Sequence, residues 1–250
     1  MLKKTLMIST LIAGFAFAGT AATAKSVFND EQKKEIRKIV EEMIFEDPFM
    51  IERAFQAKQG DREKAMQTEM KEKVQKYMKD LARKKGDPFI GNPKGDVVIV
   101  KFFDYNCGYC RQLSKTLEEL VKEDKKLKVV FKEFPVMGGE ASDRASRAAL
   151  AANDQGKYGA YYAKLMETGD YSEDNLIAMG KEIGLNTEKM KHFMNSKKAS
   201  DLIKDNRELA EKIGVPGGIP FCFVGDAFIQ GAQPKENFVN AIREARAAKK

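Results

Sequence analysis

Two cysteines separated by two residues are the most reactive pair in the sequence. Cys107 and Cys110 enclose a Gly-Tyr dipeptide between an apolar run and a stretch with helical periodicity. The N-terminus of a helix favours an anion, and the thiolate is the reactive form of cysteine in disulfide exchange. We therefore predict that Cys107 is the attacking or attacked sulfur and that Cys110 resolves the mixed disulfide. The pair would then form a redox-active disulfide that needs no cofactor and no metal ion.

The same motif has two other interpretations, a structural disulfide and half of a metal site. The chain holds three Cys and one His, too few for a closed zinc centre of the usual Cys/His type. A structural disulfide across so short a loop would give little stabilisation in the loop-entropy picture. We therefore favour disulfide exchange, with a structural disulfide and half of a metal site as the alternatives.

A proline begins the last strand-like run of the chain. Ile219, Pro220 and Phe221 follow a Gly-Gly pair. Proline is rare inside a central strand unless the strand starts there or the preceding bond is cis. We predict a cis Ile219–Pro220 bond beside Cys107, which would leave a backbone edge free for a substrate peptide. A proline that simply starts the strand is the alternative.

Lys101 interrupts the apolar run at 97–103, six residues before Cys107. A buried ammonium is costly unless it is paired. Glu133 lies on the next predicted strand and follows the same alternation of faces. We therefore expect a Lys101–Glu133 pair beneath the cysteines that helps to move the proton of Cys110. An exposed lysine at the strand end is the alternative.

Cys222 and His192 are the remaining candidates for chemistry. Cys222 alternates with Phe221 and Phe223, so we expect it to point into the core as a small apolar side chain. Its alternative is a third thiol near the motif that traps a mixed disulfide or joins a soft-metal site such as Cu(I). His192 lies in a helical pattern beside Phe193 and is expected at the surface or in packing.

The periodicity changes from helical to alternating strand and helix near residue 86. The first helix begins after Asn29 or Asp30 and stops at Pro48, and a second is expected to break around Gly60. The remaining expected elements are strands at 97–103, 127–134, 221–224 and 227–230, helices at 111–123 and 234–247, and a helical block at 140–213. This order predicts an α/β fold.

Residues 25–86 carry an apolar stripe that must be covered, because isolated amphipathic helices bury too little surface to be stable. The stripe could lie on the following domain or pair with the same segment of another subunit. We favour the second possibility, an oligomerisation region at 25–86 that makes the protein a homo-oligomer, dimer or trimer.

The N-terminus has the pattern of an export signal. Lys3 and Lys4 precede an apolar stretch, and Ala22, Thr23 and Ala24 form a small-residue cleavage site. We predict a signal peptide at 1–24, with a membrane anchor as the alternative. Its removal would lower the net charge from +7 to +5, because the segment holds two lysines and no acidic residue. That modest charge does not indicate nucleic-acid binding.

Three segments resemble the DsbA-type thioredoxin-fold thiol–disulfide oxidoreductases of the bacterial envelope, and most closely the Com1-like branch of outer-membrane antigens. They are FFDYNCGYC, IGVPGGIPFCFVGDAFIQGAQP and ASRAALAANDQGKYGAYYAKLM, and the resemblance spans about residues 28–248. It implies a thioredoxin-like domain at 87–250 with a helical insertion at about 140–213. It also implies that Cys107 is the nucleophile, Cys110 the resolving thiol, Gly108 and Tyr109 the tuning dipeptide, and Pro220 the cis proline.

The motif departs from the DsbA type in ways that leave the direction of exchange open. The Gly-Tyr dipeptide is similar to that of DsbC-type isomerases, and without a His we expect a less oxidising couple. Ile219 is closer to the valine of the oxidases. Lys101 stands where the family commonly has a buried acid.

The resemblance implies a periplasmic enzyme that forms or isomerises disulfides in cysteine-containing secreted proteins, with a membrane redox partner of the DsbB or DsbD type. One alternative is a dedicated isomerase kept reduced by a membrane reductase. Another is a non-enzymatic envelope or surface antigen, or a copper-binding protein, on the same scaffold. Association with the outer membrane or exposure at the surface is the alternative to a periplasmic location.

Overall fold

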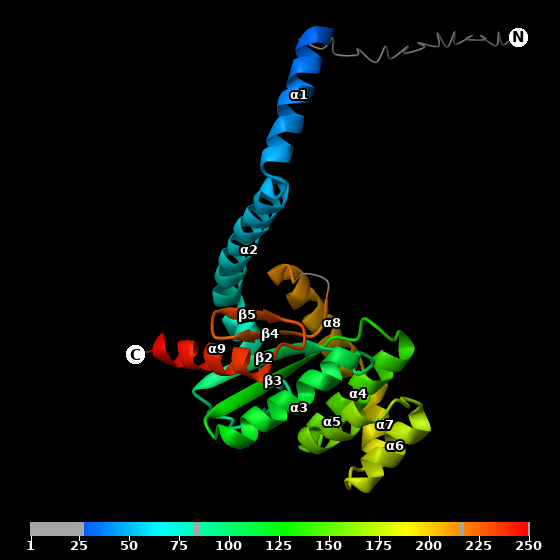
Figure 1. The fold of residues 1–250 in the computed structure, drawn as a ribbon. Coiled ribbons are helices and arrows are strands. Elements are labelled where there is room, and N and C mark those ends of the chain that lie inside the picture. Colours follow the sequence, from blue (N-terminus) through cyan, green and yellow to red (C-terminus); the bar gives the residue numbers. More distant parts are fainter. Residues whose placement is uncertain (1–27, 83–85, 216–217, 250) are drawn as a thin grey trace, which may run out of the picture. The chain divides into compact units, whose positions relative to one another are not determined.

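The computed structural model describes residues 28–82, 86–215 and 218–249 (Figure 1). The predicted signal peptide at 1–24 and the start of the predicted oligomerisation region at 25–86 lie outside these residues. The chain divides into two compact units, one ending at Lys58 and the other beginning at Gln59. This division lies within the predicted region 25–86 and not at its end.

The first unit contains helix α1 (Asp30–Glu46) and the start of helix α2 (Met50–Ala82). Asn29 caps α1 in a reciprocal pair with Gln32: each side chain accepts a hydrogen bond from the other residue's backbone, at 2.8 and 2.9 Å. No residue of α1 is buried. Its apolar stripe is therefore exposed to solvent in the single chain.

Helix α2 runs without a break through Gly60, so the expected interruption there is wrong. A glycine costs a helix about 1 kcal/mol relative to alanine, which is too little to end it when the following turns are well packed. Met70, Val74 and Leu81 are buried in the second unit, against one face of the sheet. This part of the apolar stripe is thus covered by the chain's own domain.

The sheet of the second unit has five strands in the order β1-β3-β2-β4-β5. Strands β2 and β3 are parallel, and the other neighbours are antiparallel. The strands are β1 (Phe89–Gly91), β2 (Val97–Phe103), β3 (Leu127–Glu133), β4 (Phe221–Val224) and β5 (Ala227–Gln230). Four of them confirm the predicted strands, and β1 was not predicted.

Helices cover both faces of this sheet (Figure 1). Helices α3 (Gly108–Glu123) and α9 (Lys235–Ala247) pack on one face. The end of α8 (Lys197–Ile213) packs with α2 on the other. The helical block between β3 and β4 comprises α4 (Glu140–Asp154), α5 (Tyr158–Glu167), α6 (Glu173–Glu182), α7 (Thr187–Met194) and α8 (Lys197–Ile213). The predicted thioredoxin fold with a helical insertion is confirmed.

Candidate active site

The first cysteine of the motif is the N-cap of helix α3, at the carboxyl end of β2. Cys107 has an extended backbone, and its Sγ accepts a hydrogen bond from the backbone N–H of Cys110 at 3.3 Å. This N–H is one of the first-turn donors that have no partner within the helix. The sulfur therefore lies at the N-terminal end of α3, the position that the motif predicts for it.

Opposite this helix end, the bond between Ile219 and Pro220 is cis, which confirms the prediction. The thiol of Cys107 donates to the backbone oxygen of Ile219 at 3.6 Å. Pro220 is itself buried. Residues 112 positions apart in the sequence thus form the two sides of the site.

The four residues of the motif differ in their exposure. Cys110 is fully buried, and burial raises the pKa of its thiol well above the ordinary value. Gly108 is exposed, and 68% of the Tyr109 side-chain surface is open to solvent. Cys107 is buried as well, with 4% of its surface exposed. An incoming sulfur therefore meets Cys107 first, because Cys110 has no exposed surface.

Lys101 is fully buried beneath the motif, so an exposed lysine at the strand end is excluded. Its Nζ donates to the backbone oxygen of Cys110 at 3.0 Å, to Ser114 Oγ at 2.9 Å and to Tyr162 Oη at 2.9 Å. These three bonds use all three donors of the ammonium. Burial lowers the pKa of Lys101 to about 8, and the charge of Cys110 opposes this shift.

The expected Lys101–Glu133 pair is wrong, although both residues are buried on the same side of the sheet. Glu133 Oε1 accepts from the hydroxyls of Tyr105 at 2.9 Å and Tyr158 at 2.8 Å. Burial raises the pKa of Glu133 to about 7. Tyr162 of the insertion accepts a hydrogen bond from Lys101, and Tyr158 of the insertion donates one to Glu133. Each buried ionisable group thus has a polar partner without a direct Lys101–Glu133 ion pair.

Asp104 is a site residue that the sequence reasoning missed. Its carboxylate accepts from the backbone N–H of Asn106 at 2.8 Å and the hydroxyl of Ser142 at 2.6 Å. It also accepts from the backbone N–H groups of Val136 at 2.8 Å and Met137 at 2.7 Å. Asp104 thereby joins the segment before Cys107 to the loop after β3. An acid directly after a buried strand, three residues before a cysteine, was the available signal.

Ser114 and Tyr162 were missed as well. Ser114 lies four residues after Cys110, on the same helix face, which is a signal the sequence contains. Tyr162 belongs to α5, and its hydroxyl is 2.6 Å from Ser114 Oγ. No sequence pattern indicates that Ser114 and Tyr162 are in contact, because the insertion approaches the sheet only in the folded chain.

Cys222 points into the core, as predicted. It lies on the same side of the sheet as Cys110. Burial raises the pKa of its thiol to about 12. Among the described residues, no three side chains of His, Cys, Asp and Glu are grouped so that they could hold a metal ion. His192 lies on the exposed side of α7.

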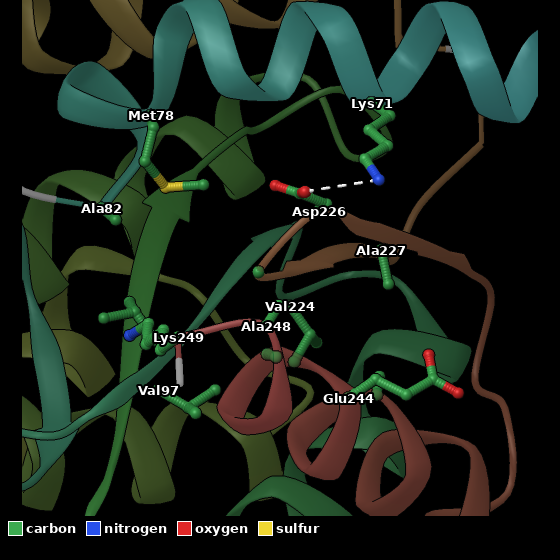
Figure 2. Close-up of a pocket in the computed structure, with 14 residues that line it drawn as sticks. Lys71, Met78, Ala82, Val97, Val224, Asp226, Ala227, Glu244, Ala248 and Lys249 are labelled. Carbon is green, nitrogen blue, oxygen red and sulfur yellow. Dashed lines mark ion pairs between the residues drawn. The ribbon is translucent and has the colours of Figure 1, made fainter.

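A separate cavity of about 410 Å³ lies between α2, the β4–β5 turn and α9 (Figure 2). Val97, Val224 and Ala227 form part of its apolar lining, and Lys71 and Asp226 form an ion pair of 3.6 Å at its edge. None of the site residues lines it. The concave space and the reactive sulfurs are therefore at different places in the second unit.

A Cys-x-x-Cys pair at a helix N-terminus, facing a cis proline on the same sheet, defines a thioredoxin-type dithiol site. Residues 98–243 match the family described as "DSBA-like thioredoxin domain". The chain belongs to this family, and the activity is that of a thiol–disulfide oxidoreductase.

Solved structures agree with this assignment. A thioredoxin-like oxidoreductase from Silicibacter pomeroyi DSS-3 is 38% identical, with a TM-score of 0.63 over 68% of this chain and 97% of that one. The thiol-disulfide exchange protein alpha-DsbA2 from Wolbachia pipientis is 28% identical, with a TM-score of 0.66 over 72% and 97%. A periplasmic thioredoxin-like protein from Salmonella enterica serovar Typhimurium is 29% identical, with a TM-score of 0.60 over 68% and 95%.

Among curated proteins, the chain is 22% identical over 157 residues to the Na(+)/H(+) antiporter NhaA 1 of Salinispora arenicola (strain CNS-205). The match covers 62% of this chain but only 24% of the length of that protein. Within the described part of this chain, no helix is long and apolar enough to span a bilayer.

Proposed function

We propose that the protein works in the periplasm, where it forms or isomerises disulfides in secreted proteins through Cys107 and Cys110. The observation that carries this proposal is the position of Cys107. Its sulfur accepts from the first turn of α3 and lies 3.6 Å from the backbone oxygen of Ile219. A peptide cysteine that reaches this sulfur meets polypeptide backbone beside it.

In the oxidising direction a substrate thiolate attacks Cys107 Sγ of the Cys107–Cys110 disulfide, and the electron pair of the broken bond leaves on Cys110. A second substrate thiolate then attacks the substrate sulfur of the mixed disulfide and releases Cys107 as a thiolate. The substrate loses two electrons and the dithiol gains them. Isomerisation uses the mixed disulfide alone and returns Cys107 unchanged.

The surface around Cys107 suits an unfolded substrate. Tyr109, Val136 and Met137 are large apolar side chains with 50–68% of their surface exposed. The hydrogen bonds of Asp104 hold the last two on the loop beside the motif. An unfolded chain with an apolar side chain near its cysteine could cover them and gain affinity from burial.

The direct test is disulfide formation and reshuffling in a reduced or scrambled model substrate. We expect Cys107→Ser to abolish both activities. Cys110→Ser should instead trap mixed disulfides, because the resolving thiol is gone. The matched control is Cys222→Ser, which we expect to retain activity. A Cys107→Ser protein with full activity would show that the scaffold does not act by dithiol exchange.

The direction in the cell depends on a membrane redox partner. A DsbB-type partner would keep the pair oxidised, whereas a DsbD-type partner would keep it reduced, as a dedicated isomerase requires. Trapping the thiols in cells and measuring the redox state of Cys107 and Cys110 distinguishes the two. A surface antigen of the Com1-like branch that only uses the scaffold would retain its binding after Cys107→Ser.

We also propose that the protein is a homo-oligomer that assembles through the N-terminal unit. Helix α1 exposes Ile36, Ile39, Val40, Met43 and Ile44, with 38–47% of each side chain open to solvent. These residues recur at the helical spacing of a single stripe. A second copy of the same stripe is the partner that this pattern fits, and it would give an isomerase a cleft for misfolded chains.

A further inference from the structure

Two lysines of the sheet are completely buried, and their surroundings differ. Lys132 Nζ lies 2.6 Å from Asp87 Oδ2, so this ammonium has a carboxylate partner. Lys101 Nζ donates only to neutral oxygens: the backbone oxygen of Cys110, Ser114 Oγ and Tyr162 Oη. Within the described residues no carboxylate forms an ion pair with Lys101. A buried ammonium without an opposite charge beside it is costly even when it is hydrogen-bonded, so its retention needs a reason.

Ionisable groups from four elements face Lys101. Four of these groups raise the pKa of Lys101: Cys110, Cys222, Cys107 and Glu133. Cys110 raises it most and Glu133 raises it least. The groups are Cys107 and Cys110 at the start of α3, Cys222 on β4, Glu133 on β3 and Tyr162 on α5. Of these, only Cys107 and Cys110 change covalent state in disulfide exchange.

We propose that Lys101 is the proton partner of Cys110, and that it stabilises the Cys110 thiolate during exchange. The inference rests on the proposed dithiol function and adds a positioning residue to it. The Lys101 ammonium is held beside Cys110 by its hydrogen bonds to the backbone oxygen of Cys110 and to the hydroxyls of Ser114 and Tyr162.

The step balances within the site. In a mixed disulfide between Cys107 and a substrate, the Cys110 thiol gives its proton to the neutral amine of Lys101. The Cys110 thiolate attacks Cys107 Sγ, the new S–S bond forms, and the old bond leaves its electron pair on the substrate sulfur. In the reverse direction Cys110 leaves as the thiolate and takes the proton back from the Lys101 ammonium.

The protonation equilibria support this pairing. Burial raises the pKa of the Cys110 thiol, and the charge of Lys101 opposes that rise. Burial lowers the pKa of Lys101 to about 8, and the charge of Cys110 opposes that fall. Burial alone therefore favours a neutral amine and a neutral thiol, and the attraction between ammonium and thiolate makes the charged pair accessible.

The test follows the oxidation of the reduced full chain by excess glutathione disulfide, with acid quenching and mass spectrometry. The first step forms a Cys107–glutathione mixed disulfide, and the second is its resolution by Cys110. We expect Lys101→Met to slow the second step by at least about tenfold at pH 7, so that the mixed disulfide accumulates. Lys101→Gln, which keeps polar atoms but no basic amine, should have the same effect and serves if the Met variant does not fold.

The pH profile separates this role from a structural one. In the wild type, the rate of the second step should rise with pH and level off near the pKa of Lys101, about 8. In Lys101→Met it should start lower and keep rising, because the Cys110 thiol must then ionise alone. Lys132→Met is the matched control: it removes a buried lysine from the opposite face, and the second step should keep its wild-type rate and profile.

Two results would overturn the assignment. One is an unchanged second step in both folded Lys101 variants. The other is equal slowing in Lys132→Met, which would mean that loss of any buried lysine disturbs the site. Both leave the proposed function intact, because the wild type still exchanges and Cys107→Ser does not. A wild-type chain that forms no mixed disulfide at all would instead refute the proposed function.

Discussion

Lys101 and Glu133 lie on the same face of the parallel strands β2 and β3, and each binds different partners. Lys101 is opposite Phe131 in the register, and Glu133 is opposite Phe103, two residues further along. The ring of Tyr162 packs on Phe131, with centroids 4.3 Å apart, and its hydroxyl accepts from Lys101. Lys101 and Glu133 are thus buried in separate polar environments, and we expect each group to gain or lose its proton independently of the other.

Glu133 should make the stability of the protein depend on pH. Burial raises its pKa from 4.5 to about 7, so between these values the folded protein keeps a proton that the unfolded chain has lost. The free energy of unfolding should therefore fall as the pH rises through this range, by at most about 3 kcal/mol. Glu133→Gln should remove this dependence and be more stable than the wild type at pH 8. Denaturant unfolding at several pH values measures it.

The matched control for this prediction is Glu167→Gln, because Glu167 is exposed on α5. It should leave the pH dependence of unfolding as it is in the wild type. If Glu133→Gln unfolds with the wild-type pH dependence, the carboxyl group is ionised in the fold at all these pH values, and its raised pKa is wrong.

Gly138 should be required for the loop beside Cys107. A Cβ at this position would overlap the side-chain amide of Asn106 and the hydroxyl of Ser142, which are next to the motif and on α4. We expect Gly138→Ala to lower the free energy of unfolding by about 1–3 kcal/mol and to slow exchange severalfold. Gly169→Ala is the control, since a Cβ there meets no atom within 4 Å. If Gly138→Ala and Gly169→Ala have the same free energy of unfolding and the same exchange rate, the loop around Gly138 accommodates a Cβ without cost, and the prediction is wrong.

The stripe on α1 gives a prediction about assembly. Ile39 and Met43 are four residues apart and each is 47% exposed. We expect the double variant Ile39→Glu, Met43→Glu to sediment as a monomer, because charges cannot be buried between apolar stripes. Lys34→Glu changes the charge on the opposite face of the helix and should leave the oligomer intact. A wild-type chain that is already monomeric at high concentration would rule out this assembly.

The parts of the fold that the sequence predicts are those set by local pattern. The apolar run at 97–103 and the turn between 224 and 227 place strands β2, β4 and β5 to the residue. Strand β1 has only three residues, too few to show alternation, and it exists because it pairs with Val129 and Val130 of β3. Helix α2 passes Gly60 because packing further along the helix outweighs the propensity of one residue.

The candidate site divides in the same way. Cys107, Cys110 and Pro220 follow from the sequence, because a helix start and a strand start position them. The partners of Lys101 do not, since Tyr162 is 61 residues away and reaches Lys101 only through the packing of α5. Sequence alternation correctly assigned Lys101 and Glu133 to one face, but it could not show that tyrosine hydroxyls would bind each of them.

Cys222 should be chemically silent in the native protein. It is fully buried, lies opposite Lys101 in the register of β2 and β4, and burial raises the pKa of its thiol to about 12. At pH 8 it is therefore a protonated thiol that reagents cannot reach. We expect iodoacetamide to modify Cys107 in the native reduced protein at least about a hundredfold faster than Cys222, as determined by peptide mass mapping.

The denatured chain is the control for this measurement, and all three cysteines should react in it. Cys222→Ala should lower the free energy of unfolding by no more than about 1–2 kcal/mol, because it removes one small buried sulfur. The exchange rate should stay at the wild-type value. Rapid alkylation of Cys222, or a disulfide between Cys110 and Cys222 in the oxidised protein, would contradict this and make Cys222 a third redox thiol. Because the Lys101 amine faces Cys222 as well as Cys110, such a disulfide would also change which thiol Lys101 serves.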